Sequence, residues 1–256
     1  MTGEPRVFRL APQEFFTLWR TVHGDRHPVP VGAKHYGRTE TDRAELAETC
    51  SRTLSARGLG TVTRPDGELH ALLRGLVEFD VGLELVFSRR GETARGLATA
   101  GWHGAFVARV GEQIQLAAFR PTALASITVS TLPAAPAGSG RSVNVRWDDY
   151  LAAGQAGERD GVEGFLESLR YAGVREPEAN TLVRAVTTRS GGGQVGLVAR
   201  GRSGQVEPTG RTLSWMDSRE GRYLVRQDGG WFILAPADPV RLTSELEDLV
   251  AAAGRG

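Results

Sequence analysis

The second half of this chain repeats features of the first half, and this similarity constrains the fold more than any other feature of the sequence. Residues 221–242 run alongside residues 104–124. Three positions match at one constant offset: Leu116, Pro121 and Leu124 match Leu234, Pro239 and Leu242. Upstream, residues 142–150 echo residues 6–15. Two copies of one supersecondary unit predict a pseudo-twofold protein with two similar cores or one shared sheet.

The first half predicts helices followed by a run of strands. Apolar residues recur at helical spacing as far as Leu76, and from Phe79 they alternate as in a strand with one buried face. The expected elements are a strand at 7–10, helices at 13–22, 39–57 and from 66 onward, strands at 79–88, 96–102, 105–110 and 113–119, and a helix at 122–130. Thr39, with Asp42 three residues on, is expected to cap the helix that ends at 57. Because the connections are too short for parallel crossovers, we expect antiparallel hairpins.

The same order restarts in the second half. The expected elements are a strand at 143–145, helices at 147–153, 162–171 and 177–188, strands at 194–199, 212–216, 221–226 and 231–234, and a helix at 239–252. Helices followed by strands in each half predict an α+β fold. We expect it to be internally duplicated and pseudo-twofold, with an antiparallel β-meander sheet and flanking helices.

Proline and glycine mark the boundary between the halves. Residues 132–140 have the composition of a linker that buries nothing. We therefore expect a first repeat half at 1–133, with helices followed by a four-stranded meander, a Pro/Gly linker at 134–140 and a second repeat half at 141–256. The halves together are expected to form one domain.

The overall composition limits the classes of partner. The net charge is only +1, and aromatic residues are not interleaved with a basic strip, so we expect no nucleic-acid partner. No signal-peptide core and no run of about 18 apolar residues is present, which predicts no membrane insertion. Cys50 is the only cysteine, so no internal disulfide can form. A cytoplasmic protein is the expectation.

The sequence offers no convincing catalytic motif. Residues 191–196 match the glycine pattern of dinucleotide-binding sites, but a helix precedes them and a strand follows, which is the reverse of the required order. We expect Gly191 to end that helix in a left-handed cap. Ser139 and Ser203 lie in flexible turns, and Cys50 falls on the apolar face of a helix. We therefore predict a protein that is not an enzyme and has no cofactor and no metal.

One alternative function remains open, a small metal-dependent hydrolase. His23, Asp25, His27 and His35 combine imidazole and carboxylate ligands that suit zinc. Two prolines, at positions 28 and 30, break any helix that would place the histidines on one face, which favours a surface loop. A third interpretation, a regulatory ligand-binding module, requires a closed apolar pocket.

Two surface features suggest protein binding. The polar loop at 88–95 carries Arg89, Arg90, Glu92 and Arg95, and residues 200–207 form its counterpart in the second half. Arginine is favoured at protein interfaces. The helices of the second half form the other feature, since their many alanines and glycines are expected to leave a shallow apolar surface.

The C-terminal part of the chain resembles the EspG family, the actinobacterial chaperones associated with ESX (type VII) secretion. The resemblance rests on residues 218–226, on residues 229–238, and on the helix that begins near Arg241. It extends to the strand at 194–200 and to residues 140–145 after the linker. The strand and helix that open the chain and the duplicated layout also fit, so the likeness covers nearly the whole sequence.

This resemblance implies a cytosolic, non-enzymatic chaperone with a quasi-twofold α+β fold around a central antiparallel sheet. Such proteins grip the helical tip of a PE–PPE heterodimer, prevent its self-association and deliver it to the secretion machine. The implied partner is therefore a helical secretion substrate, either a PE–PPE-like heterodimer or a PPE-like domain, with the free chaperone a monomer or weak homodimer. In the family, the loop between the first two meander strands and the second-half helices contact the partner, which by position assigns residues 88–95 to binding.

Overall fold

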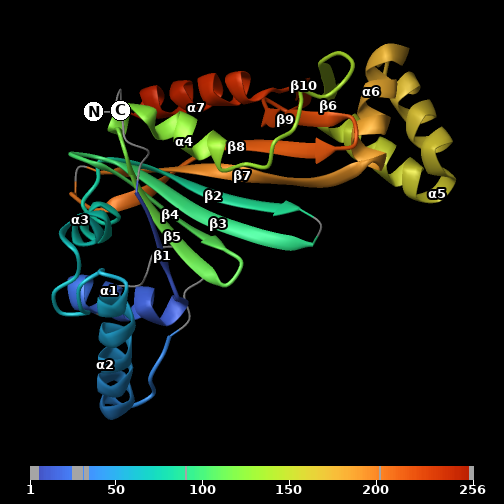
Figure 1. Cartoon of the computed structure of the whole chain (residues 1–256). Coiled ribbons are helices and arrows are strands. Elements are labelled where there is room, and N and C mark those ends of the chain that lie inside the picture. The colour runs from blue at the N-terminus through green and yellow to red at the C-terminus, as the bar shows by residue number, and fades with distance from the viewer. Residues whose placement is uncertain (1–5, 25–30, 32–34, 90, 202, 254–256) are drawn as a thin grey trace. The chain divides into compact units, whose positions relative to one another are not determined.

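The chain forms an α+β fold in the computed structural model, which describes residues 6–24, 31, 35–89, 91–201 and 203–253 (Figure 1). The elements of the first half are β1 (Val7–Leu10), α1 (Pro12–His23), α2 (Glu40–Ala56), α3 (Gly67–Gly75), β2 (Val81–Arg89), β3 (Glu92–Ala100), β4 (Gly104–Val110), β5 (Gln113–Phe119), the short 3-10 turn η1 (Pro121–Ala123) and α4 (Leu124–Ser130). Those of the second half are β6 (Val143–Arg146), α5 (Trp147–Tyr171), α6 (Glu176–Thr187), β7 (Arg189–Arg200), β8 (Val206–Ser218), β9 (Gly221–Asp228), β10 (Trp231–Pro236) and α7 (Pro239–Ala253).

The strands of the described residues form one sheet in the order β1-β5-β4-β3-β2-β7-β8-β9-β10-β6. The pairs β1–β5, β3–β4 and β4–β5 are antiparallel, as are β6–β10, β8–β9 and β9–β10. These pairings confirm the predicted α+β class with an antiparallel meander. In both halves the first strand pairs with the last strand of the meander, but the duplication into two superposable copies stays a prediction.

The chain divides into two compact units that do not coincide with the halves of the sequence. The first unit contains Met1–Val86, Ala94–Thr128 and Gly196–Gly210, and the second contains Phe87–Thr93, Val129–Val195 and Arg211–Gly256. The domain boundaries predicted at residues 133 and 140 stay a prediction.

The core of the first unit lies between its helices and one face of its strands. Phe15, Leu18 and Trp19 of α1 are buried together with Val107 of β4 and Leu116 of β5. These α1 residues recur at helical spacing, whereas the strand residues lie on one face of the pleat. The apolar patterns of the sequence therefore identify both sides of this core.

Hydrogen bonds at the start of α1 and α2 hold these helices in place. Glu14 of α1 accepts hydrogen bonds from Arg57 Nη2 at 2.7 Å, from Thr53 Oγ1 at 2.6 Å and from the backbone amide of Ala11, the N-cap residue of α1. The predicted cap of α2 is confirmed, because Thr39 Oγ1 accepts from Asp42 N at 3.1 Å and Asp42 Oδ2 accepts from Thr39 N at 3.0 Å. Hydrogen bonds from the backbone amide and the side chain of Thr39, together with one from the amide of Arg38, hold the pKa of the Asp42 carboxyl below its ordinary value.

The second unit has its own core under α5 and α6. Phe165 and Leu169 of α5 and Leu182 of α6 pack with Phe232 and Leu234 of β10. α7 lies on the other face of these strands. Glu245 of α7 forms an ion pair with Arg226 of β9, and Arg226 is opposite Ile233 of β10. Because side chains alternate along a strand, Ile233 and Arg226 face away from Phe232 and Leu234. Helices thus cover both faces of the β9–β10 ladder.

The two helices predicted at 147–153 and 162–171 meet at a break inside α5. Gly161 at this break has φ 68° and ψ −154°, a conformation that is essentially restricted to glycine. The turn packs closely as well, since a Cβ on Gly164 would lie 2.7 Å from the carbonyl oxygen of Ala156. The prediction of two helices is therefore confirmed, but the first helix continues past residue 153 to the break, so no connecting loop separates the two.

The predicted linker is packed against β9, so the expectation that it buries nothing was wrong. Ala137 forms a parallel bridge with Arg222, and Gly138 N donates to the Arg222 carbonyl at 2.8 Å. Tyr223 Oη donates to the Ser139 carbonyl at 2.9 Å. Proline and glycine give this segment an extended course, and side chains of β9 hold it in place.

The glycine-rich stretch at 191–196 lies inside β7, so the predicted helix cap at Gly191 was wrong. α6 ends at Thr187, and its C-cap residue Thr188 has φ −105°. Gly192 instead permits a close backbone approach, because a Cβ there would lie 2.6 Å from the carbonyl oxygen of Trp215. With no helix following these glycines, the dinucleotide pattern has no structural support.

Candidate partner-binding surface

The predicted binding loop at 88–95 is a hairpin with a much shorter connection than expected. β2 continues to Arg89 and β3 already begins at Glu92. Gly91 between them has φ 84°, a left-handed conformation that lets the chain reverse tightly. The expectation of a long polar loop was wrong because polar residues at a strand end continue the hydrogen-bonded ladder when a glycine supplies the turn.

The predicted contact residues do not share one face. Side chains alternate along a strand, so Glu92 and Arg95 point to opposite sides of β3. Both are exposed. Arg89 is the last residue of β2, and Arg90 lies outside the described residues.

Arg95 shares its face with a second arginine. It lies opposite Arg109 in the antiparallel register of β3 and β4. Arg109 forms an ion pair with Glu112 at 3.7 Å, whereas Arg95 forms no hydrogen bond or ion pair with any residue that the structure describes. Arg95 therefore has a complete set of N–H donors available to a partner.

The counterpart loop at 200–207 uses its first arginine to hold the fold together. Arg200 donates hydrogen bonds to three backbone carbonyls: from Nε to Phe79 at 3.0 Å, from Nη1 to Gly204 at 2.6 Å and from Nη2 to Val77 at 3.3 Å. Arg202 lies outside the described residues. Arg200 thus fixes the β7–β8 turn against the chain that leads into β2.

The helices of the second half expose large apolar side chains at their surface. Tyr171 at the end of α5 is 86% exposed, and Val162 and Leu151 of the same helix are also exposed. The small residues that were expected to form a shallow surface lie partly inside, since Ala153 and Ala179 belong to the core. α5 and α6 lie side by side (Figure 1).

The described histidines of the alternative metal site contact aromatic rings. The His23 ring lies 4.4 Å from the ring of Trp19, and its Nε2 is 2.8 Å from the Leu73 carbonyl. His35 contacts the edge of Phe16. Asp25 and His27 lie outside the described residues. In the part of the chain that the structure does describe, no group of three or more potential ligands is placed to hold a metal ion.

The predicted core position of Cys50 is confirmed. Its side chain is buried on α2, and its Sγ lies 3.8 Å from Thr17 Oγ1. Burial raises the pKa of the Cys50 thiol. A buried thiol that is harder to ionise is a poor nucleophile at neutral pH.

Sequence reasoning missed one exposed aromatic residue. Trp102 is 90% exposed in the turn between β3 and β4. It was expected to end a strand, and an indole in that position is normally half-buried. The flanking Gly101 was the available signal for a turn.

The fold and these side chains define an α+β protein whose candidate functional residues are exposed on a hairpin and on helices, a layout suited to contacts with another macromolecule. The chain belongs to the EspG family, whose model matches residues 11–248. No curated protein matches the sequence significantly. Among the described helices, none combines the length and apolar character needed to cross a membrane.

The fold is similar to a solved chaperone structure. The match is to the Mycobacterium tuberculosis type VII secretion system chaperone EspG5, determined in complex with the PE25-PPE41 dimer. The TM-score is 0.71 at 17% sequence identity, and the similarity covers 93% of this chain and 94% of that chain. The predicted membership in the EspG family and the predicted α+β fold are thus both confirmed.

Proposed function

We propose that this chain is a cytosolic type VII secretion chaperone that binds the helical tip of a PE–PPE-like heterodimer or a PPE-like domain. By covering the apolar tip it keeps the substrate from self-association and presents it for export. The observation that carries this proposal is the family match over residues 11–248, joined to a fold similarity that spans 93% of the chain. EspG5, the similar structure, is bound to a PE25-PPE41 dimer.

The β2–β3 hairpin is the first part of the proposed contact surface. Arg95 lies directly opposite Arg109, whose charge is paired with Glu112. The negative C-terminal end of a partner helix can accept hydrogen bonds from Arg95. Glu92 lies at the start of β3, and Arg89 and Arg90, which precede it in the sequence, complete the proposed contact.

The exposed end of α5 is a second candidate contact. Tyr171 presents apolar area that a helical partner would cover. Tyrosine provides a large, rigid contact area and is enriched among the residues that dominate binding energy.

We propose that the protein acts by binding and not by catalysis. The candidate nucleophile Cys50 is buried with a raised pKa, and the glycine pattern lies in a strand. The match to the EspG family also supports a chaperone rather than an enzyme.

Co-expression with each PE–PPE-like pair from the same genome, followed by size-exclusion chromatography, tests the proposal. We expect a stable complex that elutes earlier than the free chain. Replacement of Tyr171 by Ser is expected to weaken the complex, whereas Val240→Ser on α7 is a matched control at another exposed apolar residue. Failure of every PE–PPE-like or PPE-like product to co-elute contradicts the proposed partner.

A further inference from the structure

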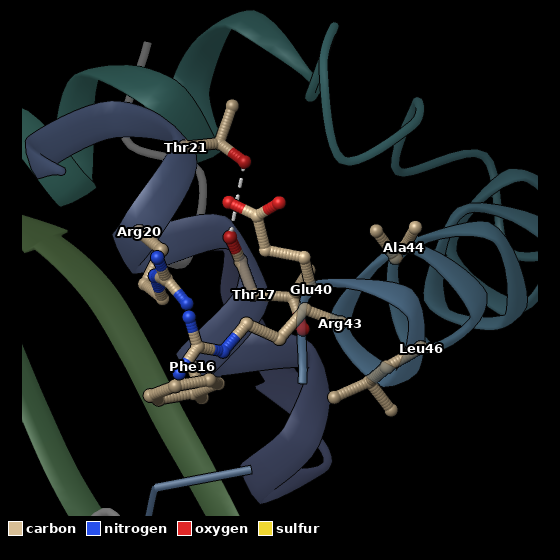
Figure 2. A pocket seen from close by; sticks show the side chains of 9 residues that line it. Phe16, Thr17, Arg20, Thr21, Glu40, Arg43, Ala44 and Leu46 are labelled. Carbon is tan, nitrogen blue, oxygen red and sulfur yellow. Dashed lines mark hydrogen bonds between the residues drawn. The ribbon is translucent and has the colours of Figure 1, made fainter. Parts of the chain in front are cut away.

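A pocket between α1 and the first turns of α2 is not used by the proposed chaperone function. Its volume is about 400 Å³, and its walls include Phe16 and Arg20 of α1 and Arg43 and Leu46 of α2. This volume falls within the range of roughly 300–1,000 Å³ that is usual for small-molecule sites. Figure 2 shows the guanidinium groups of Arg20 and Arg43 directed toward the same part of the pocket, beside the ring of Phe16.

Arg43 is held in place but keeps donors available. Its Nε donates to the Gly37 carbonyl at 3.1 Å, and its two Nη groups make no hydrogen bond within the described part of the chain. Its aliphatic stem lies close to Gly37, where an added Cβ would be 2.6 Å from Arg43 Cγ. Because Gly37 has φ 76°, this close approach depends on glycine. The guanidinium is therefore preorganised at the pocket wall.

No acidic group in the described part of the chain forms an ion pair with Arg43. Glu40 lines the pocket at the start of α2, but it forms no ion pair with the residues described. Asp42 is committed to the cap, since its Oδ2 accepts from the amides of Arg38 and Thr39. The Nη groups of Arg43 are therefore available to pair with an anionic group of a ligand.

The rest of the wall is apolar. The Phe16 ring is almost fully buried, and the Arg20 guanidinium lies 6.0 Å from the ring centroid. Leu46 and Ala47 of α2 complete this side of the pocket. A ligand that matches these walls carries an apolar body beside one planar anionic group, because the guanidinium fork pairs with a carboxylate through two parallel hydrogen bonds.

We propose that the α1–α2 pocket is a binding site for a small organic monocarboxylate, with Arg43 as the residue that recognises the carboxylate. The apolar body lies against Phe16 and Leu46. Arg20 adds positive charge on the α1 side of the pocket.

Calorimetric titration of the full-length protein with phenylacetate tests this site, with phenylacetamide as the neutral analogue of the same shape and inorganic phosphate as the anion without an apolar body. We expect saturable one-site binding of phenylacetate and at least about tenfold weaker binding of the other two compounds, as expected when a charge-assisted hydrogen bond or an apolar contact is lost. Arg43→Gln is expected to weaken phenylacetate binding by about tenfold or more. Arg52→Gln, on the same helix but outside the pocket, is expected to leave it unchanged.

A second variant tests the charge argument by removing a negative charge from the pocket wall instead of a positive one. Glu40→Gln removes the negative charge from the wall and is expected to tighten phenylacetate binding several-fold. Melting curves of each variant show whether it is folded. The proposal is overturned by the absence of saturable phenylacetate binding, by equal binding of phenylacetamide or phosphate, or by unchanged affinity of a folded Arg43→Gln protein.

Discussion

Arg222 and Asp217 form a buried two-point ion pair beside the turn of the β8–β9 hairpin. Arg222 donates from Nε to Asp217 Oδ1 at 2.6 Å and from Nη2 to Oδ2 at 3.1 Å. The Arg222 side chain is 1% exposed and also donates to the Pro133 carbonyl at 2.9 Å. One guanidinium therefore holds both a neighbouring strand and the segment that joins the halves of the chain.

Replacement of Arg222 by Ala is expected to lower the free energy of unfolding by about 3–5 kcal/mol, because it leaves the Asp217 carboxylate buried without a counter-charge. Urea denaturation at neutral pH measures the loss. Arg74→Ala is the matched control, since its ion pair with Glu78 is exposed on both sides and is expected to contribute at most about 1 kcal/mol. Equal losses in the two variants would contradict the structural role of Arg222.

Gly138→Ala tests the packed course of residues 133–140 directly. A Cβ at this position would lie 2.2 Å from the ring of Tyr223, and the ring cannot move without losing its hydrogen bond to Ser139. We expect a loss of about 1–3 kcal/mol in unfolding free energy, the usual cost of overpacking. Gly67→Ala has open space around its Cβ and serves as the control. A freely moving linker would tolerate both changes equally.

Sequence reasoning succeeded where the physical cause is local. The cap formed by Thr39 and Asp42 lies within four residues, and the apolar stripe of α1 repeats at helical spacing, so both were predicted. The alternating residues of β2 were identified for the same reason. Each of these features is determined by residues close together in the chain.

The missed features depend on residues that are distant in sequence. The Arg222–Pro133 contact joins positions 89 residues apart, and nothing near Pro133 indicates it. The continuation of the first α5 helix from residue 153 to the break at Gly161 was missed, because the glycines in between favour a loop. The α1–α2 pocket depends on how two helices pack, which no periodic pattern encodes.

The cap of α2 predicts a pH dependence. Hydrogen bonds from Thr39 lower the pKa of Asp42, so its folded pKa lies below its unfolded pKa. The resulting stability is present above the unfolded pKa, near 4, and is lost as the pH falls through the folded pKa. We expect Asp42→Asn to melt at a lower temperature than the parent protein at pH 7, and the difference to shrink toward pH 3. A difference that is the same at both pH values would show that the carboxylate charge does not contribute.

The arginines of the β2–β3 hairpin are expected to contribute to binding but not to folding. We predict that changing Arg89, Arg90 and Arg95 together to Ala weakens the complex with a PE–PPE-like partner by about 1–3 kcal/mol, the range for important interface side chains. The melting temperature should hardly change, because Arg95 is exposed and exposed side chains usually contribute about 0.5 kcal/mol or less each to stability. Calorimetric titration and a melting curve measure the two effects. The control changes Arg52, Arg64 and Arg74, which lie outside the hairpin, and is expected to leave affinity intact. Unchanged affinity in the hairpin variant would remove these arginines from the interface, and a large fall in melting temperature would assign them to the fold.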